Sequence, residues 1–360
     1  MGKRPPVLEE GLVKALQMVA PGTLVRQAID NIVLARTGAL LVFADEEEIK
    51  PLISGGIDID VELRSMILYE LAKMDGAILL DRAGTRITHA NVQLMPDANI
   101  ESLETGTRHR TADRVAKQID ALAISISAAR DVVTIYLGNT RYIMDPIRAI
   151  LDKANQALQT LERFKARLNQ VSTSLSALEF EDAVTLYDVL AVLQRSEMVL
   201  MIAQEIEHYI TELGNEGRLV QMQLDELVVD VREDRAAVLA DYLPDATPEG
   251  LAKAREALGA LRSEDLLSLG RLGETLGYAP TVNALEKHLS PRGHRMLRKI
   301  PRLNDKAIES LAGHFGNLRA MLDATVEELA GIDGLDIARA QDINEGLVRL
   351  RELNLLERYG

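Results

Sequence analysis

One short segment of the sequence concentrates side chains that bind phosphate. Residues 104–113 read Glu-Thr-Gly-Thr-Arg-His-Arg-Thr-Ala-Asp, which places three hydroxyls, two guanidinium groups and an imidazole together. An amphipathic helical pattern follows over residues 111–121, and the unpaired N–H groups of a helix N-terminus attract anions. Arginine adds two-pronged contacts to phosphate oxygens. The segment therefore predicts a di- or triphosphate site, with an exposed capping turn as the alternative.

Two other positions could complete such a site. Asp75 and Gly76 lie between an amphipathic stretch, residues 61–74, and a short apolar strand, residues 77–80. A carboxylate beside a glycine suits a magnesium ion near phosphates, although Asp-Gly is also a common turn pair. Ser127 follows a second apolar strand, residues 122–126, where its hydroxyl either donates to a phosphate or begins a turn.

Several other chemistries are excluded by composition. The sequence has no cysteine, which excludes disulfides, thiolate metal sites and cysteine nucleophiles and fits a reducing cytosol. Its six histidines lack the paired spacing of a catalytic zinc site, and it contains neither a P-loop, a GxGxxG dinucleotide pattern nor a GxSxG elbow. Its apolar runs are far shorter than the roughly 20 residues of a membrane span. We expect no membrane span and no signal peptide.

The elements that must position these residues fall into three predicted parts. Residues 1–145 alternate short apolar runs with amphipathic stretches, which is typical of a mixed α/β domain. Residues 146–290 have no proline before Pro244 and repeat apolar residues at three- and four-residue spacing, which predicts a bundle of long helices. Residues 291–360 form a third part. The predicted fold class is therefore multidomain, α/β followed by all-α.

The net charge of −14 is distributed unevenly over these parts. Residues 1–145 carry −4, residues 146–290 carry −10, and residues 291–360 are neutral with a basic beginning. The basic residues there are Arg292, Arg295, Arg298, Lys299, Arg302 and Lys306, with Asp305 as the one acid among them. Salt screens the effect of charges that lie more than about 10 Å away, so this stretch can contact phosphates even in an acidic protein. A solvated helix face is the alternative.

Two motifs, about thirty residues apart, carry a family resemblance. The Asp75-Gly76-Ala77 and Arg108-His109-Arg110 segments resemble the signature motifs of the diadenylate cyclase family. The three-part layout extends this resemblance over essentially the whole chain, to family members that also scan DNA. The resemblance implies an N-terminal cyclase domain, a helical spine and a C-terminal helix-hairpin-helix domain. It also implies condensation of two ATP molecules into cyclic di-AMP and two pyrophosphates.

The resemblance assigns roles to individual residues. Asp75 would hold Mg²⁺ or Mn²⁺, and it would act in catalysis with Arg108 and His109. The other ATP contacts that it implies are Gly76, Leu94, Thr107, Arg110, Thr111, Ser127 and Arg130. Arg110 is the weaker candidate among these, because alternate residues of an extended segment point in opposite directions.

The resemblance also implies partners. Two cyclase domains would meet face to face, as dimers within an octamer, in the cytoplasm near the nucleoid. Segments 300–303 and 332–336 resemble two DNA-binding hairpins, which hold branched DNA without reading its sequence. Asp336 stands where the second hairpin usually has a glycine, so we expect the basic residues 292–306 to make the DNA contact. A non-enzymatic sensor of nucleotide or DNA is the alternative function.

Overall fold

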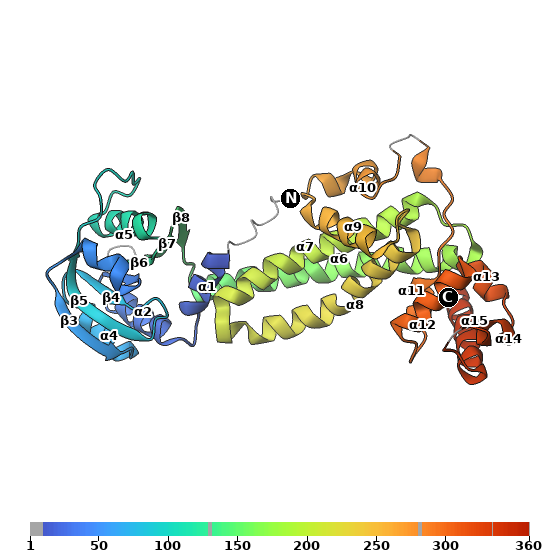
Figure 1. Ribbon diagram of the computed structural model, residues 1–360, viewed down its shortest axis with the longest axis horizontal. Helices are drawn as coiled ribbons and strands as arrows, with labels where there is room; N and C mark the ends of the chain where they lie inside the picture. The colour runs from blue at the N-terminus through green and yellow to red at the C-terminus, as the bar shows by residue number, and fades with distance from the viewer. Residues whose placement is uncertain (1–9, 129–131, 280–282, 333, 360) are drawn as a thin grey trace. The chain divides into compact units, whose positions relative to one another are not determined.

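The computed structural model describes residues 10–128, 132–279, 283–332 and 334–359 (Figure 1). The chain divides into two compact units, and each is described by itself. The first unit contains Pro6–Gln156 and Ile206–Gln221, and the second contains Ala157–Glu205 and Met222–Gly360.

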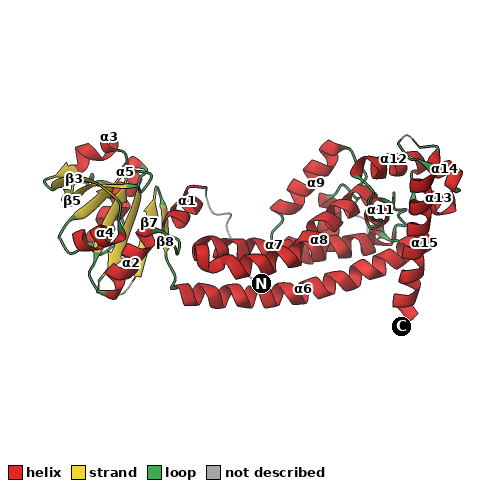
Figure 2. Ribbon diagram, turned by 90° about the horizontal axis from the view of Figure 1, so that it is seen from below, coloured by secondary structure: helices red, strands yellow, loops and turns green. Residues whose placement is uncertain are grey.

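The first unit is built on one mixed eight-stranded sheet (Figure 2). Its strands are β1 (Ala39–Phe43), β2 (Ile53–Ser54), β3 (Ile57–Glu62), β4 (Ala77–Leu80), β5 (Arg86–Leu94), β6 (Leu122–Ser127), β7 (Val132–Leu137) and β8 (Thr140–Ile143). They lie in the order β2-β5-β4-β1-β6-β7-β8, with β3 also paired to β5. Among these pairs β1 and β4 are parallel, and the others are antiparallel. The predicted mixed α/β class is confirmed.

Helices cover both faces of this sheet (Figure 1). Helices α1 (Glu10–Met18), α2 (Leu24–Leu34) and α4 (Ser65–Leu71) share a core with alternate strand residues such as Leu41. Helix α5 (Thr107–Ile119) covers the other face, where it packs on Leu40. The central strands are buried on both sides, which explains their continuous apolar runs. A four-residue helix, α3 (Glu46–Ile49), follows β1.

The predicted boundaries hold for the apolar strands and shift for the helices. The strand expected at residues 77–80 is β4, and the one expected at residues 122–126 is β6. The helix expected over residues 61–74 begins only at Ser65, because Val61 and Glu62 belong to β3. The helix expected over residues 111–121 begins four residues earlier, at Thr107. That shift changes the environment of the predicted phosphate-binding side chains.

The predicted long helices are present. They are α6 (Ile147–Glu181), α7 (Leu186–Leu213) and α8 (Arg218–Tyr242). Within the second unit, polar contacts join them to one another. Ser172 of α6 donates to Asp234 of α8 at 3.0 Å, and Arg235 of α8 pairs with Glu197 of α7 at 2.6 Å.

Shorter helices complete the second unit. They are α9 (Pro248–Ala260), α10 (Leu269–Thr275), α11 (His294–Arg298), α12 (Asp305–Phe315), α13 (Leu318–Asp323), α14 (Val326–Ala330) and α15 (Ile337–Tyr359). Helices α11 to α15 share one apolar core. The segments predicted as hairpins join α11 to α12 and α14 to α15. In the first of these turns Arg302 takes a left-handed backbone with φ of 64°, and in the second Gly334 has φ of 87°.

Candidate active site

The first unit contains a cavity of about 620 Å³ whose wall includes residues of both motifs. It is lined by Leu40, Gly76, Ala77, Val92, Gln93, Leu94, Gly106, Thr107, Arg108, His109, Thr111, Ser127 and Ala128. The structure thus brings together seven of the residues predicted from the sequence. Volume alone would not select this cavity, because others of about 720 Å³ and 610 Å³ lie elsewhere in the chain. The cavity is distinguished from these others by the predicted side chains that line it.

One wall of the cavity comes from β4 and β5. Gly76 has φ of 88°, and a Cβ atom added there would lie 2.8 Å from the carbonyl oxygen of Val92. This position therefore requires glycine, because any side chain would meet backbone that cannot move aside. Ala77 pairs with Val92, and Leu94 ends β5 with its side chain buried. This apolar wall with exposed backbone suits a flat base better than a charged group.

Asp75 adjoins this wall at the start of β4. Its side chain is exposed and directly precedes Gly76. Within the described parts of the chain, no three acidic or histidine side chains gather into a metal site. Magnesium often binds one or two carboxylates together with substrate phosphates and keeps several waters. The single carboxylate of Asp75, which does not itself line the cavity, therefore fits only a metal shared with substrate, and it does not fit an ion held by protein alone.

Another part of the cavity wall is the N-terminus of α5. Gly106 is the N-cap residue and makes no side-chain cap, so the first backbone N–H groups of the helix are left for another acceptor. Arg108 extends from this turn toward β1. An added Cβ atom at Gly38 would lie only 2.1 Å from Nη1 of Arg108, so the missing side chain of Gly38 leaves room for the guanidinium group. The sequence analysis missed Gly38.

Arg110 has a different role from the predicted one. Its Nε and Nη2 atoms donate to the carbonyl oxygens of Glu104 and Thr105, both at 3.2 Å. Arg114 and Lys117, which follow on the same helical face, donate to carbonyl oxygens of residues 98, 100 and 101. These cations hold the loop before α5, and Arg110 does not line the cavity. The structure therefore does not bring Arg110 together with the other predicted ATP contacts, and the segment expected to be extended is a helix.

The two remaining predicted contacts follow β6. Ser127 ends this strand, pairs with Val132 of β7 and lines the cavity. Arg130 lies outside the described residues. Tyr136 of β7 was also missed by the sequence analysis, because an isolated tyrosine in an apolar strand gives no signal. Its hydroxyl lies 3.0 Å from Nδ1 of His109.

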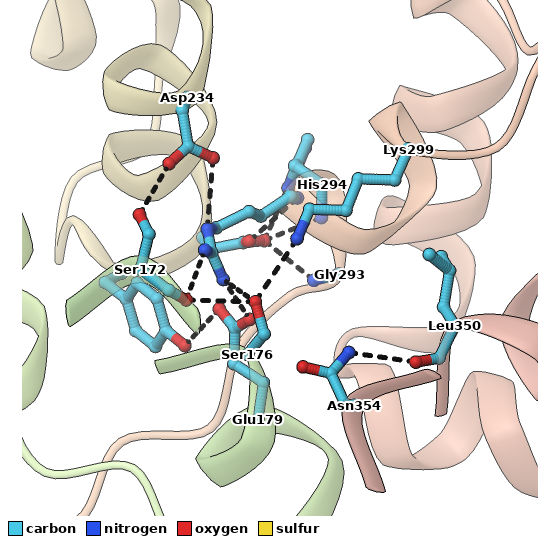
Figure 3. Close-up of polar contacts among 12 residues, drawn as sticks. Ser172, Ser176, Glu179, Asp234, Gly293, His294, Lys299, Leu350 and Asn354 are labelled. Atoms are coloured by element: carbon cyan, nitrogen blue, oxygen red, sulfur yellow. Dashed lines mark hydrogen bonds and ion pairs between the residues drawn. The ribbon is translucent and has the colours of Figure 1, made fainter. Parts of the chain in front are cut away.

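The prediction that Arg295 contacts DNA is wrong. Its side chain is 2% exposed and pairs with Glu179 at 2.6 Å and with Asp234 at 3.1 Å. It also donates to Ser176 Oγ and to the carbonyl oxygen of Ser172. Figure 3 shows these α6 and α8 side chains converging on one point. Helix packing has enclosed this cation among acids, so it cannot reach a phosphate of DNA.

The other predicted DNA contacts differ in exposure. Arg292 is partly buried and donates to three carbonyl oxygens at the end of α8, at 2.9 to 3.1 Å. Arg298 and Lys299 are exposed, although Arg298 pairs with Asp305 and Lys299 donates to Ser176 Oγ. Arg302 and Lys306 are exposed near the turn between α11 and α12. The DNA contact stays a prediction for these exposed residues.

Comparison with known proteins matches two consecutive segments of the chain to family models of the same protein. Residues 26–141 match the family model "DisA bacterial checkpoint controller nucleotide-binding", and residues 144–285 match "DisA bacterial checkpoint controller linker region". The DNA integrity scanning protein DisA of Carboxydothermus hydrogenoformans is 47% identical over 96% of this chain and 98% of its own. That of Kineococcus radiotolerans is 47% identical over 98% of both chains.

Two other findings are more limited. A crystal structure of DacA from Staphylococcus aureus matches 38% of this chain and 88% of its own at 24% identity, with a TM-score of 0.30. In the described part of the chain, we find no helix with the length and apolar character needed to cross a bilayer.

Proposed function

The chain belongs to the DisA family, and on that premise we propose that it is a diadenylate cyclase that condenses two ATP molecules into cyclic di-AMP and two pyrophosphates. The observation that carries this proposal is the single cavity shared by both motifs. Gly76 and Leu94 would provide an apolar wall for adenine, while Arg108 and His109 line the same cavity at a helix N-terminus. The apolar wall suits the adenine base of ATP, and the helix N-terminus with its basic side chains suits the triphosphate.

Each half of the reaction forms one phosphodiester bond. The 3′ oxygen of one ATP bonds to the α-phosphorus of the other, the bond from that phosphorus to pyrophosphate breaks, and the hydroxyl proton leaves. Thr107, Arg108, His109, Thr111 and Ser127 would hold the phosphates in line for this displacement. Catalysis of this kind depends on positioning and on stabilising charge that develops in the transition state.

Two cavities must face one another for both bonds to form. One cavity binds one triphosphate, so each 3′ hydroxyl needs a second copy of this domain opposite it. We therefore propose a face-to-face homodimer as the catalytic unit, assembled further into an octamer. This activity would lie in the cytoplasm, close to the nucleoid DNA that the C-terminal part contacts.

A divalent cation would complete the site. Asp75 is the residue that would hold Mg²⁺ or Mn²⁺ together with the phosphates. When bound, the cation would offset phosphate charge and increase the acidity of the attacking hydroxyl. The exposed carboxylate of Asp75 adjoins the backbone of Gly76, on which the nucleotide would lie.

We further propose that the helices after residue 290 form a helix-hairpin-helix domain that binds branched DNA without reading its sequence. The left-handed backbone at Arg302 gives the first turn the geometry that a glycine would otherwise supply. Exposed Arg298, Lys299, Arg302 and Lys306 surround that turn. Backbone N–H groups and cations of this kind hold DNA phosphates.

Product analysis tests the cyclase. The full chain is incubated with ATP and Mn²⁺ or Mg²⁺, and the nucleotides are separated by chromatography. Asp75→Asn should keep the fold and lose cyclic di-AMP formation, whereas Asp58→Asn, which alters an exposed acid of β3, should retain it. Full activity of Asp75→Asn would overturn the role of this carboxylate. ATP binding without any product from the unmodified chain would support the sensor alternative.

A further inference from the structure

The segment of residues 95–106 connects β5 to α5 and lies alongside that helix (Figure 1). Every residue of this segment, all of which the structure describes, is exposed or only partly buried. Leu103 is 101% exposed, so even the apolar side chain at the centre of the segment finds no core. A segment with so little apolar packing opens easily unless polar contacts hold it.

The polar contacts come from one face of α5. Arg110, Arg114 and Lys117 lie three and four residues apart, so their side chains form a single stripe along the helix. Each donates to backbone carbonyl oxygens of the segment, at 2.9 to 3.2 Å. We call these three cations the loop clamp. The accepting carbonyls are those of Ala98, Ile100, Glu101, Glu104 and Thr105.

Glu104 ties the same segment to the sheet. Its carboxylate pairs at 2.6 Å with Arg141 of the edge strand β8, while its carbonyl oxygen accepts from Nε of Arg110. Gly106, the N-cap residue of α5, follows two residues later. The backbone N–H of Arg110 donates to the carbonyl oxygen of Gly106 at 2.8 Å. The loop clamp and the ion pair therefore fix the point at which α5 begins.

The charge of this helix start is unusual. The first turn of α5 reads Thr-Arg-His-Arg from Thr107, although the positive end of a helix dipole normally favours acids and disfavours cations. The turn therefore has a strong positive potential, which suits an anion in the cavity that Arg108 lines. Fixing such a turn before the anion arrives lowers the ordering cost of binding.

We propose that the loop clamp is a set of positioning residues, which fixes the N-terminus of α5 so that ATP meets phosphate-binding groups already in place. This inference rests on the proposed function, because it takes the ligand of the cavity to be ATP. Arg114 gives the sharpest test. It lies about two helical turns after Thr107, does not line the cavity, and holds two carbonyls of the segment at 2.9 Å.

Equilibrium dialysis of the full chain with ATP tests this inference without requiring turnover. Arg114→Gln should weaken ATP binding by about tenfold, and Arg114→Lys, which keeps one donor, should recover part of this loss. In turnover, KM should rise more than kcat falls. Arg86→Gln is the matched control, because Arg86 of β5 also donates to a backbone carbonyl, that of Asp60 at 2.8 Å, and its loss removes the same charge. This control should bind ATP as the wild type does.

Salt separates positioning from simple attraction between Arg114 and the triphosphate. The ratio of variant to wild-type affinity should be the same in about 0.1 M and about 1 M salt, where charges are screened beyond roughly 10 Å and 3 Å. A loss that disappears in high salt, or one matched by Arg86→Gln, would overturn the inference.

Amide hydrogen exchange observes the segment itself. Residues 97–110 should exchange faster in Arg114→Gln than in the wild type, and the variant should melt close to the wild type because the segment lies outside the core. Unchanged exchange would also contradict the loop clamp. The proposed function fails separately: a chain that binds ATP with these differences but yields no cyclic di-AMP would refute the cyclase and leave the loop clamp standing.

Discussion

Replacing Arg295 by methionine tests whether this cation stabilises the second unit. Arg295 is the positive partner of Glu179, whose side chain is 0% exposed, and it also pairs with Asp234. Methionine fills a similar volume but leaves Glu179 without its cation. Breaking a buried ion pair in this way costs about 3–5 kcal/mol, because the remaining acid either stays charged without compensation or must take up a proton.

The expected loss can be measured as a change in melting temperature. For a unit of roughly 150–250 residues, each kcal/mol lowers Tm by about 2–4 °C, so Arg295→Met should lower it by about 6–20 °C. Circular dichroism of the full chain measures this directly. Arg319→Met is the matched control, because Arg319 is 69% exposed and lies 3.5 Å from Asp182. Exposed pairs contribute about 0–1 kcal/mol, so this control should melt close to the wild type.

The loss should also depend on pH. Burial raises the pKa of Glu179 to about 7, although Arg295 and Tyr242 act against this rise. An acid with a higher pKa in the folded state stabilises the fold at low pH, and this stabilisation is lost as pH rises through the folded pKa. Removing Arg295 raises the pKa of Glu179 further, so Arg295→Met should lose more stability at pH 8 than at pH 5. A loss matching that of Arg319→Met, or equal at both pH values, would refute this account.

Two further predictions concern the proposed ligands. Gly38→Ala should displace the Arg108 guanidinium and weaken ATP binding by about ten- to a hundredfold, which corresponds to about 1.5–3 kcal/mol. Gly313→Ala is the control and should bind ATP normally, because its added Cβ atom meets nothing within 4 Å. Dialysis with ATP compares them, and unchanged affinity of Gly38→Ala would contradict the placement of Arg108. Arg302→Gln and Lys306→Gln should each reduce the slope of log affinity for DNA against log salt by about 1. Titrations at several salt concentrations measure this slope, and a wild-type slope in both would exclude the turn between α11 and α12.

The sequence was most informative where local rules decide the structure. Strands β4 and β6 were predicted because their runs are almost entirely apolar, as expected for strands that are buried on both faces. The cavity was predicted through residues whose types suit phosphate, such as Arg108 and Thr107. Tyr136 and Gly38 were not predicted, because each matters through a neighbour far away in sequence. A tyrosine within a strand and a glycine directly before a strand are common in any sequence. Their importance follows only from the packing of α5 against the sheet.

The misassigned cations show what a charge pattern can and cannot predict. Arg108 and Arg110 are two residues apart, and in a helix this separation turns them by about 200°. One therefore faces the cavity and the other the preceding loop, where Arg114 and Lys117 lie on the same side. Had the helix been predicted from Gly106 onward, its 3.6-residue period would have separated these roles from sequence alone. Arg295 is different, because no local period indicates that α6 and α8 enclose it. Its role depends on tertiary packing, so a run of basic residues predicts a phosphate-binding surface only after burial has been determined for each residue.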